Sequence, residues 1–239
     1  MYCVFCRSED LPAQWAYRGL KQRGLAPLEI FTPEALVYNR RLEHRFQAGE
    51  TITRIELADG RVLDSDRVRG VLNRINFLPV EHFNVAGLDD RAYAVQEQQA
   101  IFLSWMYALP GEVINRPGAR GLCGDHRSAA EWVWLATQAG LPVLPFHQSD
   151  EQPLEFTPTN PTFQLVVFDS EVYGASAHWC QADLRNSIGR LAELSRLRLI
   201  GLDFSISSAG EPLVMSATTL PDLRLGGEIL LDALIAVFA

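Results

Sequence analysis

The first 146 residues alternate short apolar runs with longer segments of helical periodicity, and this alternation limits the folds open to the chain. The runs at 2–6 and 68–75 are typical of buried strands. Segment 10–24 predicts a helix, because Asp10 can cap its first turn and Gly24 can end it. Alternating strands and helices predict a mostly parallel, Rossmann-like sheet with helices on its faces.

Further elements follow the same pattern. Segment 50–66 predicts a hairpin turned at Asp59-Gly60, with Thr51, Thr53, Ile55 and Leu57 on one face. The remaining expected elements of this half are a long, mostly buried helix at 93–111, a short strand at 112–116, a helix at 128–140 that opens with the capping box Ser128–Glu131, and a strand at 141–146.

The composition changes at 147–162, which is polar, carries three prolines and lacks periodicity, so we expect a linker. Segment 163–239 then predicts the order β-β-α-β-β-α, an α+β layer. The expected domains are therefore an α/β domain at 1–146, the linker, and an α+β domain at 163–239.

Charge and apolar patterning exclude several classes of partner. The net charge of −8 argues against nucleic acid and against an anionic membrane, since both require a basic face. The start lacks a signal-peptide pattern, and no apolar stretch is long enough to span a bilayer. We therefore expect a cytoplasmic protein with reduced cysteines. Lys21 is its one lysine, which limits phosphate binding by lysine to a single candidate.

The first candidate ligand-binding residues lie at the ends of two predicted strands. The pairs Asn73-Arg74 and Asn115-Arg116 each follow an apolar run. Ligands of parallel α/β sheets bind at the carboxyl ends of strands, so both pairs are expected on that rim. Arginine binds carboxylates through two hydrogen bonds. Arg74 and Arg116 either hold an anionic ligand or form structural salt bridges.

Several motifs in order resemble the RimK-like ATP-grasp ligases. The similar stretches are VLNRINFLP (71–79), QEQQAIFLSWMYALPGEVINRPG (96–118), EWVWLATQAGLPVLPF (131–146), LVVFDSEVYGASAHWCQADLR (165–185) and LIGLDFSISSAGEPLVMSATTLPDL (199–223). The resemblance implies a pre-ATP-grasp domain at 1–146 and a truncated ATP-grasp C-terminal lobe at 163–239. It also implies candidate ligand-binding roles for Arg127, Arg185 and Asp203.

The chain departs from that family where Mg-ATP binds. The linker is too short to be the lysine-bearing lid lobe, and Arg127-Ser128 stands where the family has a lysine. Phe163 replaces an arginine, and the metal-binding E-x-N pair becomes Ser216 and Thr218. A hydroxyl brings no charge to magnesium, which prefers carboxylate oxygens. Asp203 alone remains, either in a metal or base role or as a turn cap.

These losses favour a non-catalytic protein with no cofactor and no metal, which binds a peptide, an amino acid or a partner biosynthetic enzyme. A homodimer is a further expectation, because loss of the lid would leave a sheet edge and an apolar face uncovered. One alternative is an ATP-dependent carboxylate–amine ligase with an unusual or partner-supplied Mg-ATP site. Another is a thiol or metal enzyme using Cys123, His126, His178 and Cys180, whereas the Cys3–Cys6 pair is expected to be two buried thiols.

Overall fold

A computed structural model describes residues 1–147, 162–175, 177 and 180–238. These residues form two compact units, 1–126 with 234–239 and 127–233. The predicted linker at 147–162 lies almost wholly outside the described residues. None of the described helices is long and apolar enough to cross a membrane.

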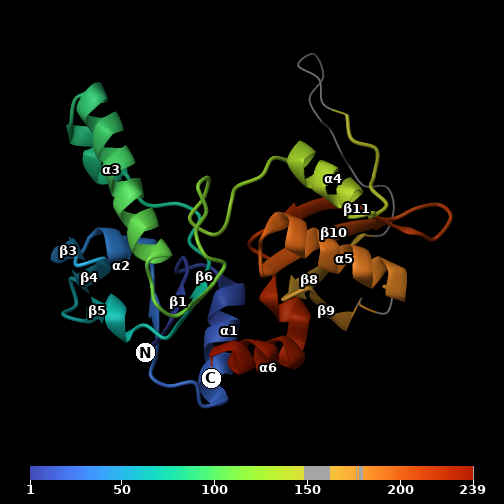
Figure 1. Cartoon of the computed structure of the whole chain (residues 1–239), viewed down its shortest axis with the longest axis horizontal. Coiled ribbons are helices and arrows are strands. Elements are labelled where there is room, and N and C mark those ends of the chain that lie inside the picture. Colours follow the sequence, from blue (N-terminus) through green and yellow to red (C-terminus); the bar gives the residue numbers. More distant parts are fainter. Residues whose placement is uncertain (148–161, 176, 178–179, 239) are drawn as a thin grey trace. The chain divides into compact units, whose positions relative to one another are not determined.

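The first unit contains two sheets and the α-helices α1, α2 and α3 (Figure 1). Its elements, in chain order, are β1 (Tyr2–Phe5), α1 (Leu11–Gln22), β2 (Leu28–Phe31), α2 (Pro33–Val37), β3 (Arg41–Gln47), β4 (Glu50–Glu56), β5 (Val62–Asp64), η1 (Ser65–Arg67), β6 (Gly70–Asn73), η2 (Glu81–Val85), α3 (Leu88–Tyr107) and β7 (Glu112–Ile114).

The parallel sheet predicted for this part of the chain is confirmed. Strands β2, β1, β6 and β7 lie in that order, and every neighbouring pair is parallel. Helix α1 begins after its N-cap Asp10, whose side chain accepts a hydrogen bond from the Ala13 amide. Gly24 follows the helix with a φ of +86°, a left-handed conformation that glycine adopts without steric cost.

The second sheet of this unit has the order β3-β4-β5 and is antiparallel. Thr53, Ile55 and Leu57 of the predicted face are buried, whereas Thr51, beside the turn, is only partly buried. Strand β3 was not predicted. It pairs with β4 through a two-residue turn at Ala48-Gly49, where both residues have positive φ.

Helix α3 corrects the expectation of a mostly buried helix. Only Phe102, Trp105 and Met106 are buried, and all three lie near its C-terminal end. There Trp105 packs against Phe5 and Phe102 at ring-centroid distances of 5.6 and 5.5 Å. The N-terminal part of the helix extends beyond the sheets (Figure 1) and leaves apolar side chains such as Leu88 exposed.

The second unit is built on one antiparallel sheet of order β11-β10-β8-β9. The predicted order β-β-α-β-β-α is confirmed. Its elements are α4 (Ala129–Gln138), β8 (Thr162–Phe168), β9 (Glu171–Tyr173), α5 (Ala182–Ser195), β10 (Leu199–Ile206), β11 (Pro212–Thr218), η4 (Leu223–Gly226) and α6 (Gly227–Phe238), the last of which ends within the first unit.

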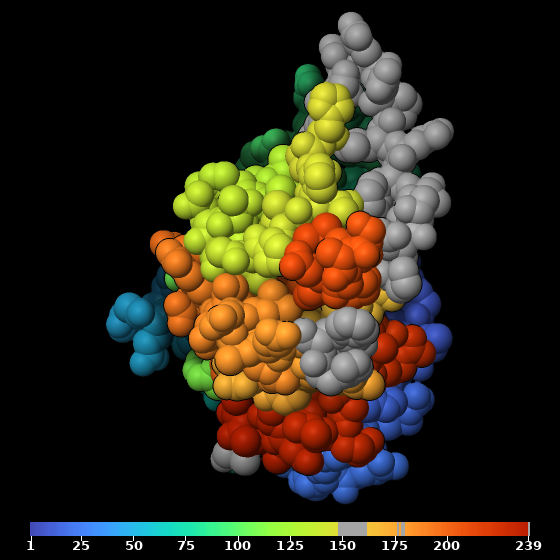
Figure 2. All heavy atoms as spheres, turned by 90° about the vertical axis from the view of Figure 1, so that its right-hand side faces the viewer, coloured from blue at the N-terminus to red at the C-terminus, as the bar shows by residue number. Residues whose placement is uncertain are grey.

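Helices α4 and α5 pack together on one face of this sheet, and Figure 2 shows them as adjoining yellow-green and orange areas. The capping box of Ser128 and Glu131 opens α4 as predicted. Trp132 is buried while Trp134 is exposed, because residues two apart lie on nearly opposite sides of a helix.

The strand expected at 141–146 is reduced to one bridge, Val143 with Val214 of β11. The Pro142 carbonyl accepts from the Val214 amide, and the Leu144 amide donates to the Val214 carbonyl. Pro142, which faces β11, has no N–H group, so the ladder cannot continue regularly towards Leu141. This segment covers part of the β11 edge.

Candidate functional site

Asn73 lies at the carboxyl end of β6 and joins three segments of the first unit. Its side-chain amide donates to the carbonyls of Asn115 at 2.9 Å and Leu122 at 2.7 Å. Its side-chain oxygen accepts from the Ile75 amide. Because Asn73 and Asn115 are both buried, the amide fixes the two predicted strand ends beside each other.

Arg74 forms a buried ion pair with Asp10. Its Nε atom donates to Asp10 Oδ2 at 2.7 Å and its Nη2 atom to Oδ1 at 3.2 Å. The side chain of Arg74 is 4% exposed and that of Asp10 is 15% exposed. Asp10 also caps α1, so one carboxylate connects the start of that helix to the end of β6.

Arg116 binds backbone carbonyls at the last residue of α3 and in the segment just after it. Its Nη1 atom donates to the carbonyls of Tyr107 at 2.6 Å and Leu109 at 3.1 Å, and Nη2 donates to that of Gly111 at 2.8 Å. The last carbonyls of a helix have no partner within the helix and carry partial negative charge. The guanidinium thus supplies a hydrogen-bond donor to the carbonyl of Tyr107, the last residue of α3.

The two candidate arginines of the second unit also bind carbonyls. Arg127 Nη2 donates to the Ser195 carbonyl at 2.7 Å, at the end of α5, and its guanidinium lies 5.3 Å from the Trp132 ring centroid. Arg185 donates to the carbonyls of Cys180 and Ala177, both at 3.1 Å. All four predicted arginines therefore have partners within the protein.

Asp203 lies on β10 between two direct cross-strand partners, Gln164 of β8 and Ser216 of β11. Gln164 Nε2 donates to Asp203 Oδ1 at 2.7 Å, and Ser216 Oγ donates to Asp203 Oδ2 at 2.5 Å. Both carboxylate oxygens thus accept a hydrogen bond from a neutral side chain. Thr218 Oγ1 accepts from the Leu220 amide.

Gln164 was missed by the sequence analysis, although it has a second role. Its Oε1 atom accepts from the Asp222 amide at 3.1 Å. Asp222 itself binds Arg224 through Nε at 2.8 Å and Nη2 at 2.6 Å. The sequence signal for Gln164 was its position just before the apolar run of β8. Its pairing with Asp203 could not be predicted, because it depends on the register between β8 and β10.

The donor set around Asp203 does not fit Mg-ATP. Magnesium binds best to several hard oxygen ligands including carboxylates, whereas Ser216 and Thr218 supply hydroxyls already engaged in hydrogen bonds. Within the described ranges no group of three His, Cys, Asp or Glu side chains could hold a metal ion. Lys21 lies on α1 with its ammonium 5.7 Å from the Tyr17 ring centroid.

Phe163 occupies the position where the resemblance places an arginine. Its ring stacks on Phe204 with centroids 5.2 Å apart and planes 7° from parallel. Both residues belong to the apolar layer between the sheet and helices α4 and α5. The side chain at this position therefore contributes to packing.

The thiol candidates lie in apolar surroundings. The Cys123 thiol donates to the Asn73 carbonyl at 3.0 Å, and burial raises the pKa of the Cys180 thiol. Cys123 and Cys180 belong to different units, and His178 lies outside the described residues. Burial also raises the pKa of both Cys3 and Cys6 to about 12. A thiolate nucleophile needs a lowered pKa, whereas burial raises the pKa of Cys3, Cys6 and Cys180.

The sequence matches no protein-family model and no curated protein. Solved structures do match it. The ATP-grasp ligase PsnB, complexed with a phosphomimetic variant of a minimal precursor, Mg and ADP, has a TM-score of 0.72 at 16% identity over 100% of this chain and 97% of that chain. The chain has the ATP-grasp ligase fold.

Two further structures agree with this assignment. Macrocyclase MdnC from Microcystis aeruginosa, bound with precursor peptide MdnA, gives a TM-score of 0.71 at 10% identity over 98% of this chain and 99% of that chain. A RiPP-associated ATP-grasp ligase from Chryseobacterium gregarium, in complex with ADP and a leader and core peptide, gives 0.68 at 11% identity over 98% and 96%. The α/β fold class expected from the sequence is thereby confirmed.

Proposed function

We propose that this protein is a non-catalytic peptide-binding member of the ATP-grasp fold, degenerate relative to RimK-like ligases. One observation carries the proposal. The carboxylate of Asp203 is bonded on one side by Gln164 and on the other by Ser216, both neutral. A metal ion at Asp203 would have to displace a hydrogen bond and would gain only hydroxyls beside it.

The contacts of the arginines support the same conclusion. Phosphoryl transfer requires cations on the γ-phosphate. Arg116 and Arg127 instead hold the carbonyls that end α3 and α5. Moving either guanidinium to a phosphate would break these hydrogen bonds, each of which contributes about 0.5–1.5 kcal/mol.

A peptide is the ligand that the fold comparisons favour. PsnB, MdnC and the Chryseobacterium gregarium ligase were each solved with a precursor, leader or core peptide. We propose that this chain retains peptide binding without the ATP reaction. It would act beside a biosynthetic enzyme or as a homodimer, and light scattering after size-exclusion chromatography at several concentrations tests the homodimer.

Isothermal titration calorimetry with Mg-ATP tests the loss of the nucleotide site. Sodium phosphate with MgCl2 is the matched control. We expect no heat of binding beyond the control at high protein concentration. Micromolar binding, about −8 kcal/mol, would contradict the proposal and support the ligase alternative.

A further inference from the structure

The first unit contains a pocket of about 490 Å³ beside Arg116, which binds the carbonyl of the lining residue Tyr107. Its walls are the tip of the β3–β4 hairpin, the C-terminal part of α3 and a loop after β7. The lining residues are Phe46, Thr51, Leu103, Ser104, Tyr107, Ala108, Pro117, Gly118 and Ala119. Carbon-rich side chains predominate, and Phe46 and Tyr107 are 72% and 67% exposed.

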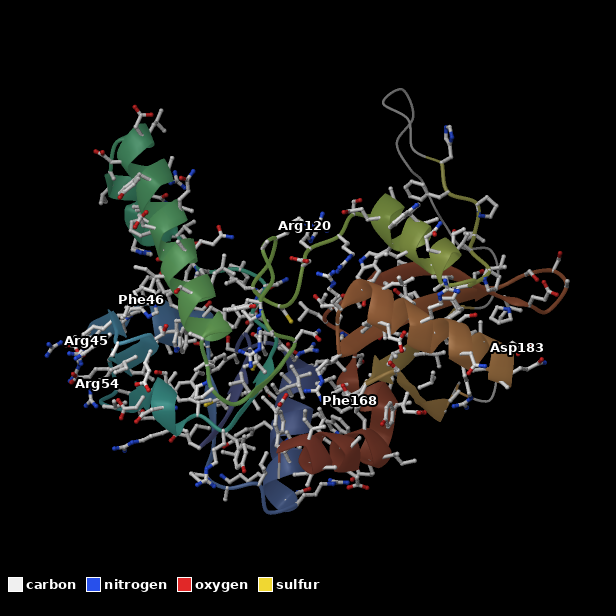
Figure 3. The ribbon with its side chains drawn as sticks, in the orientation of Figure 1. Arg45, Phe46, Arg54, Arg120, Phe168 and Asp183 are labelled. Atoms are coloured by element: carbon white, nitrogen blue, oxygen red, sulfur yellow. The ribbon has the colours of Figure 1, made fainter. Side chains whose placement is uncertain are left out.

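The hairpin is fixed to α3 by a histidine. His44 Nδ1 lies 2.7 Å from Thr53 Oγ1 on β4, and Nε2 lies 3.0 Å from Ser104 Oγ on α3. Phe46, two residues further along β3, therefore projects on the same face as His44. Figure 3 shows Phe46 beside α3, whereas Arg45 and Arg54 extend away from it.

Strand β3 has one paired edge in the part of the chain that the structure describes, the edge facing β4. Gln47 and Glu50 face each other across the two-residue turn, so they form the first hydrogen-bonded pair. Hydrogen-bonded and non-hydrogen-bonded pairs then alternate along the ladder. The backbone N–H and C=O groups of Leu42, His44 and Phe46 consequently point away from β4.

A hydrogen bond on the opposite edge of β4 agrees with this alternation of hydrogen-bonded and non-hydrogen-bonded pairs. Thr53 is the direct partner of His44, and its amide donates to Ser65 Oγ at 2.9 Å, on the β5 side. Thr53 and His44 are thus a non-hydrogen-bonded pair, and the His44 amide faces the outer edge of β3. Such a row of backbone donors and acceptors is the surface to which an extended peptide adds as a strand.

We propose that the outer edge of β3 binds an extended peptide segment, which places a bulky apolar side chain in the neighbouring pocket. This inference rests on the proposed peptide-binding function and names its docking surface. In an added strand, alternate side chains face α3 and the others face the side of Arg41 and Arg45. Both arginine side chains are more than half exposed and share one ion-pair partner, Glu43, so these three side chains carry one net positive charge and the second set is expected to include an acidic residue.

The probe is a phage library of random dodecapeptides selected on the full chain, followed by synthesis of the enriched peptides. Phe46→Ser and Tyr107→Ser are each expected to weaken binding about tenfold or more, because each removes an aromatic pocket wall. Leu11→Ser is the matched control, since Leu11 is also an exposed apolar residue of this unit but lies outside the pocket. Its affinity is expected to match the unsubstituted protein.

Amide hydrogen exchange tests strand addition separately. A bound peptide should slow exchange at Leu42, His44 and Phe46. It should leave Glu43 and Arg45 unchanged, since their amides already face β4.

The outcomes separate this inference from the proposed function. Enriched peptides that bind Phe46→Ser and Tyr107→Ser at full affinity would overturn the docking surface and leave peptide binding intact. Equal protection of all β3 amides would overturn strand addition, as would protection of the outer-edge amides by self-association without peptide. Failure to enrich any peptide would contradict both the docking surface and peptide binding.

Discussion

Ser216 and Asp203 face each other directly across the β10–β11 pair, and the serine hydroxyl donates to the carboxylate at 2.5 Å. Where the resemblance to ATP-grasp ligases leads one to expect a second acidic ligand, a neutral donor stabilises the first. The ladder between the strands shifts register immediately after Asp203. The pair therefore connects two strands at the point where their regular hydrogen bonding is interrupted.

The variant Ser216→Glu should convert this pair into a metal-dependent one. Two facing carboxylates repel each other, and the hydrogen bond is lost, so we expect a destabilisation of about 1–3 kcal/mol without metal. Magnesium or manganese should raise the melting temperature of this variant. Ser216→Ala is the control, because it loses the hydrogen bond without adding charge. Equal responses of the two variants to metal would contradict the explanation.

Arg74→Ala should be among the most destabilising single substitutions in the first unit. Removing the arginine leaves Asp10 largely buried without its ion-pair partner, which costs about 3–5 kcal/mol. Urea unfolding followed by circular dichroism measures the change. Arg54→Ala breaks the exposed pair with Asp64 and should cost about 1 kcal/mol or less. Similar losses for both variants would show that the buried pair contributes little.

His44 should make stability depend on pH. Burial lowers the pKa of His44 below its ordinary value of 6.5, so the unfolded chain takes up this proton at a higher pH than the folded chain. The free energy of unfolding should therefore fall as pH drops below about 6.5, by at most about 1.4 kcal/mol per pH unit for one proton. It should level off once the folded histidine is protonated too.

The variant His44→Gln tests this dependence through unfolding titrations between mildly acidic and neutral pH. Its stability should change less over that range than that of the unsubstituted protein. His126→Gln is the matched control, because His126 is exposed. A pH profile that His44→Gln leaves unaltered would assign the dependence to other groups.

Cys3, Cys6 and Cys180 should resist alkylation in the folded protein. Burial raises the pKa of Cys3 and Cys6 to about 12 and also raises that of Cys180, so few thiolates exist at pH 8. Iodoacetamide followed by mass spectrometry should label them only after denaturant is added. Rapid labelling of Cys180 in the native state would favour the thiol-enzyme alternative.

Local chemistry explains why much of the fold could be predicted. The Asp10 cap and the Ser128–Glu131 box depend on residues within one helical turn, and both are present. The extent to which α3 is buried could not be predicted from such local motifs. The run around Tyr93 lacks a clear polar face, but burial requires neighbouring elements, and these surround only the C-terminal end near Trp105.

The sequence allowed candidate residues to be named, but it did not predict the partners that these residues have in the structure. Arginine at strand and helix ends was recognised, whereas the Arg127 guanidinium reaches the Ser195 carbonyl, which lies 68 positions away in sequence. Such contacts depend on tertiary structure. Strand β3 was missed for a different reason. Its turn, Ala48-Gly49, lacks the asparagine or aspartate that usually marks a tight hairpin.

Helix α6 gives the chain an order of assembly. Its C-terminal residues belong to the first unit, where Phe238 lies 6.2 Å from the Tyr2 ring centroid and fills the space beside Gly70. During synthesis, Tyr2 leaves the ribosome long before Phe238 is made. The first unit therefore cannot complete its packing until Phe238 has been made, and its apolar surface beside Tyr2 and Gly70 stays uncovered while the second unit is being synthesised.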